Sequence, residues 1–178
     1  MRNKVFRYAG IEYDDVANGE NLGAVVFTQF CPHHCKECQN PQTWSKNGGK
    51  IFTTNNMTNL IKYYQNCPFA KRFTLSGGDP ISNKEFSIYI IQTLKNKFPY
   101  LTIWLYTGYL FEEVKKNNLN LLKMIDVLVD GKYDYTKRDI TLAWCGSSNQ
   151  RVIDVQESLK RDKICLLYTS PSPRDGLL

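Results

Sequence analysis

The sequence contains few histidines, no long apolar run and no block of like charge. Its two histidines, His33 and His34, are neighbours, so no histidine-centred acid–base constellation can form from separate parts of the chain. No apolar run approaches the roughly 18 residues of a membrane span. The segment Met1–Tyr8 also lacks the apolar stretch of a secretory signal. We therefore expect a soluble, cytoplasmic protein with no membrane partner.

The charge is spread along the chain rather than gathered. There are 23 lysines and arginines against 17 aspartates and glutamates, which gives a net charge of +6. A nucleic-acid-binding protein would be expected to show a basic stripe interleaved with aromatic residues, or a known binding motif, and neither is evident. The charge therefore favours a mixed, solvated surface. Direct nucleic-acid binding is kept only as an alternative, which salt-dependent retention on DNA or RNA would support.

Length and composition fit one folded domain. A chain of 178 residues with 42% hydrophobic and 22% charged residues lies near the averages for globular domains. From Cys165 onward the sequence changes character, because Ser-Pro-Ser-Pro occurs there without any period. We predict one domain over residues 1–156 and a poorly ordered tail over residues 157–178.

Apolar patterning predicts an α/β domain with a parallel sheet. Helical stripes at 57–64 and 86–94 alternate with strand-like runs, and capping-box spacing at Ser82–Glu85 predicts a helix that begins near residue 83. The predicted strands are 25–30, 72–76, 102–107 and 125–129, with a possible fifth at 151–155. Trp104 and Tyr106 lie in the third of these segments and Tyr109 follows it, and alternating aromatics on a strand favour core over cavity lining.

Polar and glycine-rich stretches follow each of the first four predicted strands. They are Cys31–Cys38, Gly77–Asp79, Thr107–Tyr109 and Asp130–Lys132. Because sites in parallel α/β sheets and barrels assemble at the carboxyl ends of the strands, we expect these stretches to share one site.

Three of the six cysteines, Cys31, Cys35 and Cys38, fall in one short loop. Four thiolates fill the corners of an ordinary [4Fe–4S] cluster, so three leave one iron open to a substrate. The alternative is zinc, with His33 or His34 completing a Cys3His set in a structural interaction module. Position favours the cluster, because no later cysteine or histidine pair follows, as a zinc knuckle would require.

The remaining cysteines, Cys67, Cys145 and Cys165, are isolated. Lone cysteines in a reducing compartment usually behave as small buried hydrophobes, so none of them is expected to be a ligand or to form a disulfide.

The Cys-x3-Cys-x2-Cys spacing after a strand resembles the signature of the radical S-adenosylmethionine superfamily. Four further motifs narrow the resemblance to the activating enzymes of anaerobic ribonucleoside-triphosphate reductase, which are glycyl-radical activating enzymes. They are Phe73–Pro80, Ile103–Tyr109, Asp126–Tyr133 and Trp144–Arg151. The resemblance runs from the N-terminus to about Val155, so the predicted domain over residues 1–156 would be a radical SAM activase domain.

The resemblance implies a fold, a cluster and a cofactor. The fold would be an incomplete (β/α) TIM-like barrel of the radical SAM type, with mostly parallel strands. Cys31, Cys35 and Cys38 would hold a [4Fe–4S] cluster whose fourth iron binds S-adenosyl-L-methionine.

Further residues are implied to contact S-adenosylmethionine. The Gly77-Gly78-Asp79 loop would hold the methionine amino group, which suits a backbone that can approach a ligand closely and a carboxylate that accepts hydrogen bonds from an ammonium. Glu37, Cys38 and Gln39 would lie against the adenosine, and Asp130 and Lys132 would stand near the cofactor. Taken without the cysteine loop, Gly77–Asp79 and Asp130–Lys132 would each be interpreted as an ordinary turn.

The implied reaction is reductive cleavage of S-adenosylmethionine and formation of a glycyl radical on the large subunit of anaerobic ribonucleoside-triphosphate reductase. The electron would come from a low-potential donor such as flavodoxin. An alternative is activation of another glycyl-radical enzyme, such as pyruvate formate-lyase.

Four positions depart from the family pattern. Gly23 stands where relatives commonly end a glycine-rich turn with arginine, Phe30 and Glu37 replace frequent glycines beside the cysteines, and Cys145 replaces a common arginine. These departures concern loop geometry and partner docking rather than the three cysteine ligands.

Overall fold

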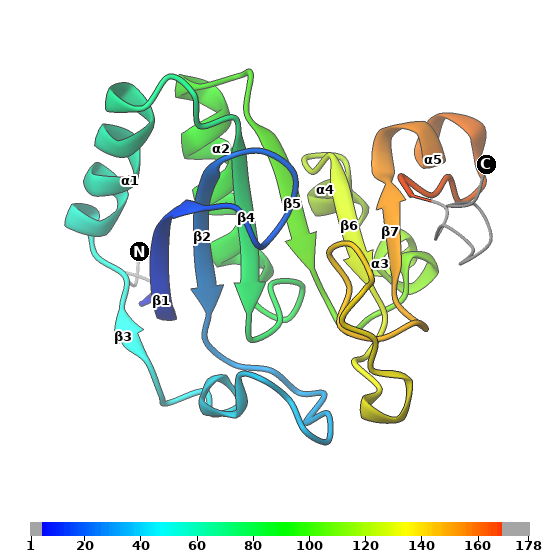
Figure 1. Cartoon of the computed structure of the whole chain (residues 1–178). Coiled ribbons are helices and arrows are strands. Elements are labelled where there is room, and N and C mark those ends of the chain that lie inside the picture. The colour runs from blue at the N-terminus through cyan, green and yellow to red at the C-terminus, as the bar shows by residue number, and fades with distance from the viewer. Residues whose placement is uncertain (1–4, 169–178) are drawn as a thin grey trace.

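A seven-stranded sheet organises the chain in the computed structural model, which describes residues 5–168. The strand order is β3-β1-β2-β4-β5-β6-β7 (Figure 1). The strands are β1 (Arg7–Asp15), β2 (Gly23–Thr28), β3 (Lys50–Ile51), β4 (Arg72–Gly77), β5 (Thr102–Tyr106), β6 (Val127–Asp130) and β7 (Arg151–Asp154). The sheet is open and does not close into a barrel.

Helices α2, α3 and α4 lie behind the sheet in Figure 1, where they cover one of its faces. The helices are α1 (Thr54–Asn66), α2 (Lys84–Lys97), α3 (Phe111–Asn117), α4 (Leu119–Leu122) and α5 (Val155–Arg161), with short 3-10 turns η1 (Pro41–Thr43) and η2 (Tyr135–Lys137). Strand side chains such as Leu75 and Leu105 pack there against helix side chains such as Ile90, and all three are fully buried. This apolar layer is the main core of the protein.

The four central strands, β2, β4, β5 and β6, are parallel as predicted. The edges differ from the prediction, because β1 and β3 pair antiparallel on one side and β7 pairs antiparallel with β6 on the other. A parallel neighbour needs a long crossover that is usually a helix. The short turn between β1 and β2 provides none, and the stretch between β6 and β7 contains only the 3-10 turn η2. The strand predicted at 151–155 therefore exists but runs in the opposite direction.

Helix α2 begins at Lys84, close to the predicted start, but the predicted capping box at Ser82–Glu85 is wrong. Asn83 is the N-cap residue, with no side-chain capping bond. Its amide instead donates to the carbonyl oxygens of Phe30 at 3.2 Å and Asp79 at 2.9 Å. The start of α2 is thus fastened to the loop that follows β2, which the local sequence pattern could not reveal.

The predicted boundary at residue 156 falls inside α5, which spans Val155–Arg161. Beyond that helix, Leu166 forms a β-bridge with Ile153. The part of the predicted tail over residues 169–178 lies outside the described residues. Within residues 5–168, no helix has the length and apolarity needed to cross a membrane.

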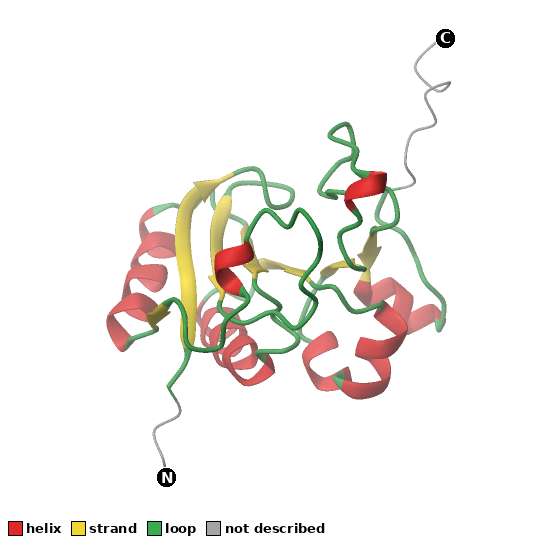
Figure 2. Ribbon diagram, turned by 90° about the horizontal axis from the view of Figure 1, so that it is seen from below, coloured by secondary structure: helices red, strands yellow, loops and turns green. Residues whose placement is uncertain are grey.

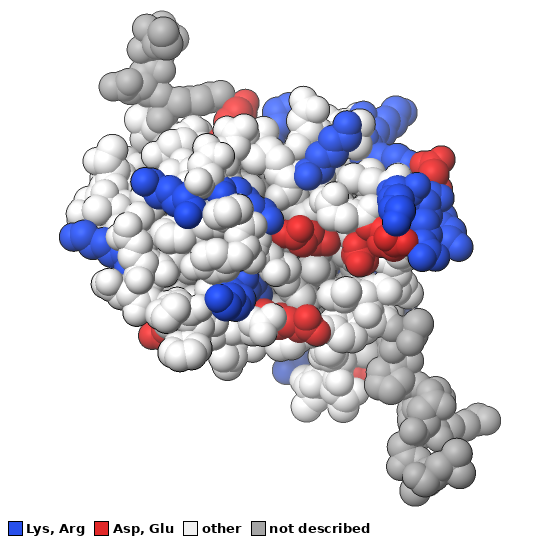
Figure 3. Space-filling model, turned by 90° about the horizontal axis from the view of Figure 1, so that it is seen from above, with Lys and Arg blue, Asp and Glu red and all other residues white. Residues whose placement is uncertain are grey.

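Charged side chains on the face of the molecule seen from above form several separate groups (Figure 3). Lysine and arginine are most concentrated at one edge of this view, and acidic side chains lie among the basic groups. This distribution agrees with the mixed surface expected from the sequence.

Truncating the core should destabilise the protein far more than truncating its surface. Ile103 on β5 is fully buried, whereas Ile140 is 85% exposed. We expect Ile103→Ala to lower the free energy of unfolding by about 2–5 kcal/mol, and the matched Ile140→Ala to change it by less than about 0.5 kcal/mol. Urea unfolding followed by circular dichroism measures both values, and equal effects would contradict the assignment of the core.

Candidate active site

A cavity of about 460 Å³ opens at the carboxyl ends of the parallel strands. Figure 2, seen from below, shows the loops gathered over these strand ends. Strands β2, β4 and β5 contribute to the lining, and so do Gly131 and Tyr133 just after β6, as the sequence predicts for the carboxyl edge of a parallel sheet. The lining residues used below are Asn18, Cys31, Cys35, Cys38, Gln39, Gly77, Gly78, Asp79, Tyr106, Gly131, Tyr133 and Gln150.

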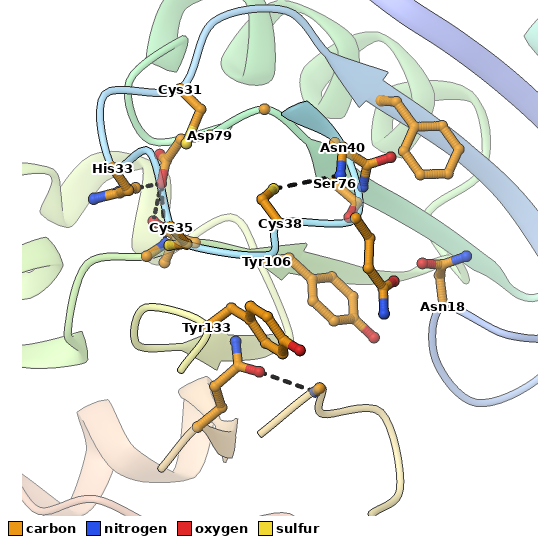
Figure 4. A pocket seen from close by; sticks show the side chains of 18 of the residues that line it. Asn18, Cys31, His33, Cys35, Cys38, Asn40, Ser76, Asp79, Tyr106 and Tyr133 are labelled. Carbon is orange, nitrogen blue, oxygen red and sulfur yellow. Dashed lines mark hydrogen bonds and ion pairs between the residues drawn. The ribbon is translucent and has the colours of Figure 1, made fainter. Parts of the chain in front are cut away.

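The three loop cysteines border this one cavity (Figure 4). All three are free and half-buried. Burial raises the pKa of Cys31 to about 11, and burial likewise raises the pKa of Cys35. The backbone N–H of Asn40 donates to Cys38 Sγ at 3.3 Å. A metal centre here would therefore have to displace protons from Cys31 and Cys35 on binding.

Backbone hydrogen bonds hold the start of the cysteine loop against the segment around η1. The N–H of Phe30 donates to the carbonyl of Thr43 at 2.7 Å, and the N–H of Cys31 to that of Trp44 at 3.5 Å. Nε2 of the buried Gln29 also donates to the carbonyl of Ser45 at 2.8 Å. The position of Cys31 is thus set by pairing with a later part of the chain.

Phe30 and Glu37 both adopt left-handed backbone conformations, with φ of 82° and 56°. These are two of the positions where the family pattern has frequent glycines. Glycine takes a positive φ freely, whereas another residue costs roughly 1–2 kcal/mol there. Phe30 and Glu37 therefore hold their turns in a backbone conformation that glycine adopts more readily.

The two glycines after β4 allow the backbone to pass very close to the cysteine loop. A Cβ on Gly77, whose φ is +89°, would lie 2.6 Å from Cα of Phe27, and one on Gly78 would lie 2.5 Å from the carbonyl oxygen of Phe30. The N–H of Gly78 donates to the carbonyl of Thr28 at 2.8 Å. Both glycines are thus required by contact with the end of β2 and the residues that follow it.

The Asp79 carboxylate is fully buried and accepts four hydrogen bonds from three loops. Oδ2 accepts from His33 Nε2 at 2.7 Å, Thr107 Oγ1 at 2.8 Å and the Gly108 N–H at 3.0 Å. Oδ1 accepts from the Ser82 N–H at 2.9 Å. Burial alone would raise the pKa of Asp79, but these donors outweigh it and leave the pKa below its usual value. The carboxylate therefore joins the loops after β2, β4 and β5.

The two histidines contact different partners. His33 binds Asp79 and packs against the Tyr109 ring, with 4.5 Å between ring centroids. His34 stacks on Trp44 at 4.7 Å. In the part of the chain that the structure describes, no group of three histidine, cysteine, aspartate or glutamate side chains is placed to hold a single metal ion.

The other predicted cofactor residues are placed in three different ways. Gln39 lines the cavity, as does Cys38. Glu37 is exposed and is not part of the lining. Asp130 and Lys132 are also outside the lining, which instead includes Gly131 between them.

Asp130 makes interactions within the protein itself. It is fully buried and accepts from the Phe111 N–H at 2.7 Å and from Arg151 Nε at 3.0 Å. It thereby joins the start of α3 to β7.

The charge of Lys132 lies close enough to Cys35 to favour its thiolate.

Several lining residues escaped sequence reasoning. Asn18 comes from the turn between β1 and β2, Tyr133 from the segment after β6, and Gln150 from the stretch before β7. Gln150 Nε2 donates to the carbonyl of Gly131 at 3.0 Å, while its Oε1 accepts from the Gly146 N–H at 2.9 Å. The polar stretch at 146–150 thus closes one side of the cavity, although locally it reads only as a turn.

The predicted aromatic segment divides between core and cavity. Trp104 is 1% exposed and belongs to a small core cluster, as predicted. Tyr106 instead lines the cavity, and burial raises its pKa well above the usual range. Its phenol therefore stays protonated.

Comparisons with known proteins agree with this geometry. Residues 17–153 match the family model described as a 4Fe-4S single cluster domain. The chain is 38% identical over 140 residues to the anaerobic ribonucleoside-triphosphate reductase-activating protein of Enterobacteria phage T4, covering 78% of this chain and 87% of that protein. The protein of the same name in Haemophilus influenzae is 37% identical, and the match covers 76% of this chain and 90% of that protein. The one in Escherichia coli strain K12 is 33% identical, with 78% of this chain and 92% of that protein covered.

The Asp79 carboxylate should make the stability of the metal-free protein pH-dependent. Its pKa is lowered on folding, so its contribution is complete above the unfolded value of about 3.9 and is lost as the pH falls through the folded value. We expect Asp79→Asn to lower the free energy of unfolding by about 2–3 kcal/mol at pH 7. Denaturant unfolding between pH 7 and pH 3 should show this difference shrinking below about pH 4. A constant difference across that range would contradict the account.

Proposed function

The chain belongs to the family of anaerobic ribonucleoside-triphosphate reductase-activating proteins, and we propose that it is a radical SAM enzyme that generates a glycyl radical on such a reductase. One observation carries the proposal: three free thiols of a single loop border the same cavity as the close-packed Gly77 and Gly78 backbone. A cluster held by three cysteines keeps one iron for a second ligand. Gly77 and Gly78, which packing against β2 and the residues after it requires, line that cavity with backbone groups alone, and this suits a ligand bound by carbonyl oxygens.

The residues at the cavity fit a [4Fe–4S] cluster and S-adenosylmethionine. Cys31, Cys35 and Cys38 would be the cluster ligands, and the lining contains no fourth cysteine. When bound, the two groups supply one-electron reductive cleavage of a sulfonium, with methionine and 5′-deoxyadenosine as products once a glycine has lost a hydrogen atom. The electron would come from a low-potential donor such as flavodoxin.

The chain's own groups would bind and orient the cofactor. The carbonyls beside Gly77 and Gly78 would accept hydrogen bonds from the methionine ammonium. Because all the donors to Asp79 come from the protein, we assign that carboxylate to holding the loop in place. Its direct effect on the cofactor would be electrostatic attraction to the methionine ammonium. Cys38 and Gln39 would lie against the adenosine. Glu37 would contact it through its backbone.

Two further assignments follow from charge. Lys132 would favour the thiolate form of Cys35, which is the form that binds metal. Asp130 would act through the position of the loop after β6, because its carboxylate binds Arg151 and the start of α3. Neither side chain needs to touch the cofactor for these effects.

The fold supports the same function. The four parallel strands carry Cys31–Cys38, Gly77–Asp79, Thr107–Tyr109 and Asp130–Lys132 at their carboxyl ends, as an incomplete (β/α) barrel of the radical SAM type would. An open sheet leaves the cavity accessible from one side, which suits a reaction whose substrate is a glycine within another protein. We propose that this glycine belongs to the large subunit of the reductase.

The ligand assignment predicts how cysteine variants behave. We expect Cys31→Ala, Cys35→Ala and Cys38→Ala each to lose most of the iron and sulfide after anaerobic reconstitution, because each removes one of three ligands. The matched control Cys67→Ala should keep both, since Cys67 ends α1 and does not line the cavity. Loss of the cluster in Cys67→Ala together with its retention in Cys31→Ala would contradict the assignment, as would stoichiometric zinc without sulfide.

The reaction itself can be tested in two steps. Reduced, reconstituted protein should convert S-adenosylmethionine into 5′-deoxyadenosine, measured by chromatography, and mixing with the reductase under anaerobic conditions should yield a glycyl radical by electron paramagnetic resonance. No 5′-deoxyadenosine would refute the enzyme assignment. Product without a glycyl radical on the reductase, but with one on pyruvate formate-lyase, would change the partner.

A further inference from the structure

The turn between β1 and β2, residues 16–22, lies across the face of the sheet opposite the helices. Figure 1 shows it passing in front of β4. A Cβ on Gly19 in this turn would lie 2.7 Å from both Arg72 Cδ and Trp104 Cδ2, so the turn packs directly on β4 and β5. Asn18 from the same turn lines the cavity, at the opposite end from Cys31 and Cys35 in Figure 4.

One fully buried arginine, Arg72 at the start of β4, donates several of the hydrogen bonds that hold this turn. Thr74 Oγ1 and the Lys71 N–H donate others, to the carbonyls of Asn18 and Leu22. Arg72 Nε donates to the carbonyl of Asn21 at 3.1 Å, and Nη1 donates to that of Asn18 at 2.8 Å. Nη2 donates to both the backbone carbonyl and the Oδ1 of Asp15, each at 2.6 Å. A single guanidinium therefore holds Asp15, the last residue of β1, and two residues of the turn.

Asp15, which Arg72 holds, in turn fixes the Asn18 side chain by hydrogen bonds. Its Oδ1 accepts from the Asn18 N–H at 3.0 Å and its Oδ2 from Asn18 Nδ2 at 2.9 Å. Burial alone would raise the pKa of Asp15, but the bonds from Arg72 and Asn18 outweigh it and lower the pKa. With Nδ2 turned toward Asp15, Oδ1 is the amide atom left to accept from a donor in the cavity.

The backbone of Arg72 lies against the strand that follows this turn. Gly23 and Arg72 are direct partners in the parallel pairing of β2 with β4. A Cβ on Gly23 would lie only 2.0 Å from the carbonyl oxygen of Arg72, so no side chain fits at position 23. The end of the turn is therefore packed directly on the residue whose side chain holds its earlier part.

We propose that Arg72 is a positioning residue for substrate binding, which fixes the turn at 16–22 and thereby the Asn18 end of the cavity. The proposal rests on the proposed function for the identity of the substrate, a glycine-containing segment of the reductase. The Asn18 end lies opposite Cys31 and Cys35 (Figure 4), so we expect this restraint to act on substrate binding and to leave cluster assembly and S-adenosylmethionine cleavage intact.

The test uses Arg72→Lys in the reconstituted protein. Lysine keeps the charge beside Asp15 but cannot donate to Asp15, Asn18 and Asn21 together. Iron and sulfide content and 5′-deoxyadenosine formation without reductase should stay at the wild-type level. Amide hydrogen exchange in residues 16–22 should rise by about tenfold or more, and KM for the reductase by about threefold or more with little change in kcat.

A second variant and a control keep the test decisive. Asp15→Asn should reproduce the same local rise in exchange, and it serves alone if Arg72→Lys does not fold. Arg7→Lys is the control, because Arg7 on β1 also donates to backbone carbonyls, those of Gly48 and Gly49 at 3.2 and 3.3 Å. It should leave exchange in residues 16–22 and KM unchanged.

Three results would overturn the proposal. They are unchanged exchange in residues 16–22, an equal rise throughout β4, β5 and β6, and the same local effect in Arg7→Lys. If the wild-type protein formed no 5′-deoxyadenosine, the proposed function would fail, and the exchange measurements would still decide whether Arg72 fixes the turn.

Discussion

A buried carboxylate with four donors is the interaction on which the rest of the site depends. Asp79 receives hydrogen bonds from the cysteine loop through His33, from the end of β5 through Thr107 and Gly108, and from the approach to α2 through Ser82. A buried ion is tolerable only when its hydrogen-bonding capacity is met. The three loops must therefore come together around it, and this places the thiols beside the Gly77-Gly78 backbone.

The central fold and the cysteine loop could be predicted from sequence because both have strong local signals. Apolar runs marked the four parallel strands, and the cysteine spacing marked one loop. The edge strands lacked such a signal, since half-exposed β1 carries polar residues and glycine. The direction of β7 depends on its connection rather than on its composition.

The finer contacts of the site were hidden because they join distant residues. Asn18, Tyr133 and Gln150 border the cavity only through folding of loops that read locally as turns. Asp130 looked like a ligand-binding residue beside a glycine, yet Arg151 and the start of α3 occupy its carboxylate. A sequence gives the chemistry of a side chain, whereas its partners follow from the fold.

Different walls of the cavity are synthesised at different times. Asn18 and the three cysteines lie in its first quarter, whereas Gln150, which closes the lining through Gly131 and Gly146, comes near its end. On the ribosome, where chains grow at about 5–20 residues per second, the thiols therefore emerge several seconds before the last wall of their cavity has been synthesised. During that interval no complete cavity encloses the cysteine loop. A cluster bound to the loop at this stage would therefore be exposed to solvent, where it could be exchanged or oxidised.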